Sequence, residues 1–149
     1  MADKTTNELN EILGKVNTRE ELSEYLSGSD MNNFTKFSEY FNSLEKVRNI
    51  GKNKIIKDSG LDRTYGYQLL DLTKNKHLGR DKIIALSIAA GLDMKEMRRG
   101  LEIAGYSPLY SRDRRDAVII FAVNQGLDVM KTNELLYEHG FEILKTIKD

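Results

Sequence analysis

Apolar residues recur every three or four positions along most of the chain, which is the spacing of one face of an α-helix. Near the N-terminus this spacing predicts two short amphipathic helices, at residues 5–14 and 18–27, and Thr18 with Glu21 predicts a capping box for the second. The polar stretch 28–33 reads as a linker. Because such short helices are marginal in water, we expect their apolar faces to pack on the rest of the chain or on a second copy.

Aromatic residues dominate the apolar face of the next segment, residues 34–48. Their spacing predicts one continuous helix, and an aromatic stripe of this kind is more typical of a core than of a ligand site. The residues that form the stripe are Phe34, Phe37, Tyr40, Phe41, Leu44 and Val47.

Residues 51–72 predict two short helices joined by a tight turn. Ile55 and Ile56 give the first helix its apolar face, and Gly60 follows its end. Glycine adopts the left-handed backbone of a helix end at little cost, and an aspartate such as Asp62 accepts hydrogen bonds from the first turn of the next helix. Leu61 lies between them and is expected to fill the corner.

The C-terminal part of the chain contains an internal repeat, in which residues 80–109 align on 115–144 at a constant offset of 35. Each copy predicts a helix, a Gly-Leu-Asp turn, a second helix and a glycine stop. Two copies are too few for a solenoid, so we expect them to pack against the 51–72 hairpin. The helix at 115–125 is apolar nearly all round and is expected at the centre of the C-terminal half.

Charge is unevenly distributed although the 149-residue chain is neutral overall. Residues 1–45 hold 4 basic and 9 acidic side chains (−5), residues 46–82 hold 10 and 4 (+6), and residues 83–149 hold 9 and 10 (−1). A local basic patch attracts phosphates more effectively than net charge suggests, because screening limits each charge to about 8–10 Å. The alternative for 46–82 is a solvated lysine-rich surface.

Several classes of function lack their sequence signatures. The chain has no cysteine, which excludes disulfides and thiolate metal sites, and it shows no signal peptide or membrane-span pattern, so we expect a cytoplasmic protein. No phosphate-binding glycine loop, zinc-protease pattern or activated nucleophile is evident, which predicts neither an enzyme nor a cofactor. His77 and His139 are isolated and predict no metal site. Arg112, Arg114 and Arg115 adjoin Asp113 and Asp116, and we favour a structural role for this cluster.

The 51–72 segment resembles the helix-turn-helix of λ-repressor-like (Xre-type) DNA-binding proteins. The resemblance rests on Lys52 at the start of the first helix, on Ile55 with Ile56, and on Gly60-Leu61-Asp62 in the turn. Further stretches are similar to a clostridial-type branch of these regulators, and with them the likeness covers most of the chain. They are RTYGYQLL (63–70), Arg80-Asp81-Lys82, GYSPLY (105–110) and RDRRDAVIIFA (112–122).

The resemblance implies an all-α fold and sequence-specific binding of double-stranded DNA. A five-helix λ-repressor-like core would span residues 34–105, with helical hairpins at 1–30 and 106–149. The recognition helix would begin at Arg63, and residues early on such a helix reach base edges in the major groove. The implied base contacts are Arg63, Thr64, Tyr67 and Gln68, of which Arg63 suits guanine and Gln68 suits adenine. The implied phosphate contacts are Lys52, Asn53, Lys74, Lys76 and Arg80.

Three further expectations follow. Members of this family usually bind two half-sites, so we expect a homodimer, with the 115–144 hairpin as its interface and the N-terminal hairpin as the alternative. Gly66 lies inside the recognition helix, where Gly66→Ala should raise stability if a methyl group fits, and should lower it if the backbone packs against Tyr65 or the first core helix. The alternative to DNA binding is a helical adaptor that docks a protein such as a kinase or toxin.

Overall fold

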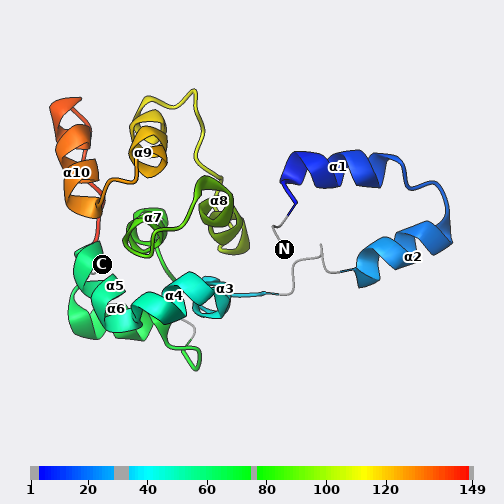
Figure 1. Ribbon diagram of the computed structural model, residues 1–149, viewed down its shortest axis with the longest axis horizontal. Coiled ribbons are helices and arrows are strands. Elements are labelled where there is room, and N and C mark those ends of the chain that lie inside the picture. Colours follow the sequence, from blue (N-terminus) through cyan, green and yellow to red (C-terminus); the bar gives the residue numbers. More distant parts are fainter. Residues whose placement is uncertain (1–3, 29–33, 75–76, 148–149) are drawn as a thin grey trace. The chain divides into compact units, whose positions relative to one another are not determined.

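Helices form all the regular secondary structure in the part of the chain described by this computed structural model, residues 4–28, 34–74 and 77–147 (Figure 1). The predicted all-α fold is therefore confirmed. The chain divides into two compact units, residues 1–35 and 36–149. Within the described residues, no helix is both long and apolar enough to cross a membrane.

The first unit contains α1 (Thr6–Gly14) and α2 (Arg19–Ser27), which match the two helices predicted there. Neither helix contains a buried residue. The capping box predicted at the start of α2 forms only in part. The Thr18 hydroxyl accepts from the Glu21 backbone N–H at 3.0 Å, as a capping box requires. The Glu21 carboxylate, however, accepts from the Thr18 hydroxyl at 3.2 Å and not from the Thr18 backbone N–H.

The second unit, residues 36–149, contains the remaining described helices, and 106–149 shares one hydrophobic core with the segment before it. Its helices are α3 (Phe37–Ser43), α4 (Glu45–Ile50), α5 (Lys52–Ser59), α6 (Arg63–Leu70), α7 (Arg80–Ala89), α8 (Met94–Ile103), α9 (Arg114–Asn124) and α10 (Val129–Glu138).

The single aromatic helix predicted over 34–48 is wrong, because the chain breaks at Leu44 into α3 and α4. Leu44 is extended (φ −75°, ψ 131°). Just before the break, the Ser43 hydroxyl donates to the Tyr40 carbonyl, and the Asn42 amide donates to the carbonyls of Ser38 and Leu70. Side chains that bond the backbone in this way compete with helix continuation. The described residues between 34 and 105 consequently form six helices instead of five.

The turn between α5 and α6 forms as predicted. Gly60 has a left-handed backbone (φ 84°), and Leu61 is buried with 6% of its surface exposed. The Asp62 carboxylate accepts from the Tyr65 N–H at 3.1 Å and caps α6, which begins at Arg63. The buried Ser59 hydroxyl accepts from the Leu61 N–H, which fixes the inside of the turn.

Helix α7, and not α9, occupies the centre of the unit. The side chains from Ile83 to Leu86 are fully buried, since α7 packs against α5, α8 and α10. The expectation that 115–125 would be central is wrong. Helix α9 buries Ile119 and Ala122 on one side, but Phe121 on another side is 54% exposed.

The two repeats are joined by reciprocal ion pairs between equivalent positions. Arg80 pairs with Asp116 through two N–H···O bonds of 3.0 and 2.9 Å, and Arg115 pairs with Asp81 through two more of the same lengths. Each arginine therefore bonds the aspartate of the other repeat. A mutual exchange of this kind is the pattern of a two-fold interface. It closes the repeats into a pair, which explains why two copies suffice without a third.

Each ion pair also holds the segment that ends its repeat. Arg80 donates to the carbonyls of Ser107 and Pro108, and Arg115 donates to those of Glu142 and Ile143, which lie 35 positions later. Likewise, Asp116 accepts from the Tyr110 N–H at 3.0 Å and Asp81 from the Lys145 N–H at 2.9 Å. Within the Arg-Asp cluster, Arg115 and Asp116 consequently have the structural role that the sequence favoured.

Gly66→Ala should destabilise the protein. A Cβ on Gly66 would lie 2.5 Å from Cγ2 and 3.0 Å from Cγ1 of Ile56, so it would clash with a side chain of α5. The overpacking should cost about 1–3 kcal/mol, more than the roughly 0.5–1 kcal/mol gained in helix propensity. Chemical denaturation measures the difference. In an Ile56→Ala background the penalty should shrink, and an equal penalty in both backgrounds would place the clash elsewhere.

The ion pairs predict acid sensitivity. Burial raises the pKa of Asp116, but hydrogen bonds from Arg80 and the Tyr110 N–H outweigh this effect and hold the pKa below its usual value. The pKa of Asp81 is lowered in the same way, because bonds from Arg115 and the Lys145 N–H outweigh its burial. A depressed folded-state pKa stabilises the protein above the unfolded pKa, about 4, and this stability is lost as the pH falls.

Asp116→Asn should therefore cost about 2 kcal/mol of unfolding free energy at pH 7 and reduce the further loss between pH 5 and 2. Denaturant unfolding across this pH range is the measurement. Asp128→Asn is the matched control, because Asp128 is an exposed helix cap outside the ion pairs and asparagine caps equally well. Parallel pH profiles of wild type and Asp116→Asn would contradict the assignment.

Candidate nucleic-acid interface

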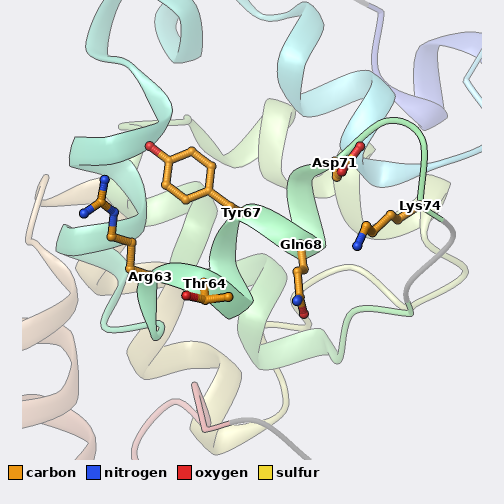
Figure 2. Close-up of a pocket in the computed structure, with 6 residues that line it drawn as sticks. All are labelled: Arg63, Thr64, Tyr67, Gln68, Asp71 and Lys74. Carbon is orange, nitrogen blue, oxygen red and sulfur yellow. The ribbon is translucent and has the colours of Figure 1, made fainter.

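Helix α6 divides cleanly into a buried and an exposed side. Tyr65, Leu69 and Leu70 are each at most 8% exposed and fix the helix in the core. The side chains on the opposite side are Arg63, Thr64, Tyr67 and Gln68, of which only Gln68 is partly buried. The structure thus brings together the four residues that were predicted to contact bases, and Figure 2 shows them along one side of α6.

A hollow of about 430 Å³ is lined by these four side chains together with Asp71 and Lys74 (Figure 2). Lys74 comes from the connection after α6 and points back toward Gln68. Arg63 makes no hydrogen bond or ion pair with any other described residue, so its guanidinium is available to a ligand. The hollow therefore presents several side-chain hydrogen-bond donors.

A second hollow, of about 470 Å³, lies at the turn between α5 and α6. Arg63 lines both hollows, so they adjoin one another at the start of α6. The second is lined by Asn53, Ile56, Lys57, Gly60, Leu61 and Arg63. Two cations and an amide therefore surround it.

The residues predicted to contact phosphates do not all lie at this surface. Asn53 lines the second hollow and Lys74 the first, while Lys52 opens α5. Lys76 lies outside the described residues. Arg80 is the correction: its guanidinium donates four hydrogen bonds inside the protein, to Asp116, Ser107 and Pro108. Because these bonds occupy nearly all its N–H groups, we remove Arg80 from the phosphate set.

Sequence reasoning missed two residues at this surface, Lys57 and Asp71. Lys57 follows Asn53 by four positions, a spacing that puts both on one face of α5 and would have identified it. Asp71 accepts bonds from the Thr73 hydroxyl at 2.7 Å and the Thr73 N–H at 2.8 Å. These bonds, and then the nearby charges of Lys74 and Lys52, hold the pKa of Asp71 below its usual value. The surface thus includes one fixed negative charge.

His77 is exposed, and one nitrogen of its ring is hydrogen-bonded to Tyr106. Its Nε2 lies 2.6 Å from the Tyr106 hydroxyl, which donates to the Leu78 carbonyl at 2.8 Å. This contact ties the start of α7 to the segment that ends the first repeat. Across the described residues, no group of three or more His, Cys, Asp or Glu side chains is arranged to hold a metal ion.

Comparisons with known proteins return no match to a family model, a curated protein or a solved structure. The function is accordingly inferred from the residues and geometry of this chain.

Proposed function

We propose that this protein binds double-stranded DNA sequence-specifically, with α6 lying in the major groove. The observation that carries the proposal is the exposed side of α6, where Arg63, Thr64, Tyr67 and Gln68 project together from a short helix that a tight turn and a buried side hold in place. A major groove admits one α-helix and is read by such side chains. The resemblance of residues 51–72 to λ-repressor-like helix-turn-helix proteins points to the same function.

The chemistry of the four side chains suits base edges. Arg63 can donate two parallel bonds to O6 and N7 of guanine, and Gln68 can both donate to and accept from adenine. Thr64 offers a hydroxyl and a methyl group, and Tyr67, 38% exposed, adds an aromatic contact. Phosphates would be held by the cations and amide around the helix, Lys52, Asn53, Lys57 and Lys74, and Lys76 remains a prediction.

The two classes of residue should respond differently to substitution. Arg63→Ala or Gln68→Ala should cost about 1–3 kcal/mol on the preferred DNA site and relax the preference at one base pair, with little loss on random DNA. Lys52→Ala or Lys74→Ala should weaken both kinds of binding alike. Either lysine substitution should also reduce the slope of log affinity against log salt by about 0.9 for each phosphate that the variant no longer neutralises.

The preferred site is first selected from a random DNA pool, and affinities are then measured over a range of salt. Lys15→Ala, an exposed lysine at the end of α1, is the matched control and should behave as wild type. If the Arg63 and Gln68 variants keep full preference, α6 is not the reading helix. If wild type shows no salt-dependent DNA binding, the protein is instead a helical adaptor.

A homodimer would let two α6 helices read two half-sites about one helical turn apart. The α9–α10 hairpin supports this part of the proposal, since it exposes 54% of Phe121, 72% of Met130 and 79% of Tyr137. Large apolar side chains exposed to this extent are typical of contact surfaces. Its other side is part of the core, where Ile119 and Leu136 are fully buried, so removing the hairpin would unfold the unit.

Point substitutions therefore test the dimer better than truncation. Phe121→Lys and Tyr137→Lys should each raise the dimer dissociation constant at least tenfold, because a buried apolar contact of this size contributes about 1.5–3 kcal/mol. Sedimentation equilibrium measures the change. Leu72→Lys, at a 50% exposed leucine beyond α6, is the control. A dimer that both variants leave intact would exclude the α9–α10 hairpin as its interface.

A further inference from the structure

The N-terminal hairpin, α1 with α2, presents large apolar side chains that the rest of the described chain leaves exposed. Neither helix contains a buried residue. Four apolar side chains are between 37% and 54% exposed, namely Ile12, Leu13, Leu22 and Leu26. Helices of nine residues are marginal in water and gain most of their stability from packing. A further apolar contact would therefore stabilise this hairpin.

A third hollow, of about 380 Å³, is formed jointly by the two helices and the residues that follow them. Three of the side chains that line it are apolar, Ile12, Val16 and Tyr25, and three are charged, Lys15, Glu21 and Glu24. An apolar hollow between two helices is a shape into which the apolar side of a third helix packs. Each helix of the hairpin is about 14 Å long, so two to three turns of such a helix would lie in contact.

Carboxylates without a partner cation give this hollow its charge. Glu24 makes no side-chain hydrogen bond or ion pair with any described residue, and the Glu21 carboxylate accepts from the uncharged Thr18 hydroxyl. Lys15 pairs with neither glutamate. The whole unit is acidic as well, because residues 1–35 hold 3 basic and 7 acidic side chains (−4). A ligand that carries positive charge would therefore fit here better than a neutral one.

Charge favours a helix of another protein over a second copy of the hairpin. Two hairpins of charge −4 would repel one another, and like charges brought together across an interface oppose association. A basic amphipathic helix avoids this repulsion. Its apolar side would contact the three apolar residues of the hollow, and its Lys or Arg side chains would lie beside Glu21 and Glu24. Helices that bind in grooves use apolar anchors spaced three or four positions apart, which is the spacing of such a helix.

We propose that the N-terminal hairpin is a docking site for a basic amphipathic helix of a partner protein. The partner helix packs its apolar side into the third hollow and pairs its cations with Glu21 and Glu24. This site uses neither α6 nor the cations of residues 46–82, so it is independent of the proposed DNA binding.

The test measures binding of synthetic peptides to the full chain by calorimetry, without DNA. The probe is a peptide of about 18 residues in which Leu and Lys alternate with the helical period, so that one side is apolar and the other basic. One control peptide replaces each Lys with Glu, and a second has the composition of the probe in an order that forms no apolar side. The probe should bind wild type at least tenfold more tightly than either control peptide.

Three variants locate the binding. Glu24→Lys should weaken the probe about five- to tenfold and strengthen the Glu peptide, because it exchanges an attractive pair for a repulsive one. Val16→Glu should weaken the probe about tenfold although it adds a negative charge, since it puts a carboxylate among the apolar contacts. Glu11→Lys is the matched control, because Glu11 is an exposed residue of α1 that does not line the hollow, and it should bind the probe as wild type does.

Circular dichroism of each variant separates lost contacts from lost helix, and Glu24→Lys, at an exposed position, should keep the wild-type helix content. Equal losses in Glu24→Lys and Glu11→Lys would mean that the probe responds to net charge alone, which would overturn the docking site. Failure of wild type to prefer the probe over the control peptides would overturn it as well. A dimer in sedimentation equilibrium that Val16→Glu dissociates would assign the hollow to a second copy instead. None of these outcomes depends on whether α6 binds DNA.

Discussion

The reciprocal ion pairs of Arg80 with Asp116 and of Arg115 with Asp81 determine how the rest of the second unit is arranged. They join the first turns of α7 and α9, and the same four side chains hold the segments that end the two repeats. Helix α7 is thereby fixed at the centre, where it supports α5. The directional bonds of these partly buried pairs favour one register of α7 against α9.

The candidate interface is supported by the core on which α5 and α6 pack. Helices α5 and α6 are short, and short helices gain most of their stability from packing. Here Ile56 contacts Gly66 so closely that no larger residue fits, which fixes the separation of the two helices. A reading helix must be placed within a fraction of an ångström to aim several side chains together. The glycine that looked like a weakness in α6 is the residue that lets the two helices approach.

The parts of the fold that could be predicted from the sequence are those encoded locally. The prediction for the turn was confirmed at Gly60, Leu61 and Asp62, which are the left-handed residue, the buried residue and the helix cap. Such features depend on residues only a few positions apart. The break at Leu44 was missed because Asn42 bonds Leu70, a partner 28 positions away. Arg80 was assigned to phosphates for the same reason, since its partner Asp116 lies 36 positions along the chain. Apolar content alone likewise did not distinguish α7 from α9, because burial depends on how many neighbours surround each helix.

Asp71 gives the proposed interface a property that its cations alone would not have. This carboxylate is held by Thr73 beside Lys52 and Lys74, so a negative charge is fixed where a DNA backbone would approach. It would repel the phosphates of any sequence that approached, whereas base contacts would lengthen the stay only at the preferred site. If α6 reads DNA as proposed, this carboxylate would lower the affinity for all sequences and so shorten the time spent on each wrong one, which would speed the search for the preferred site.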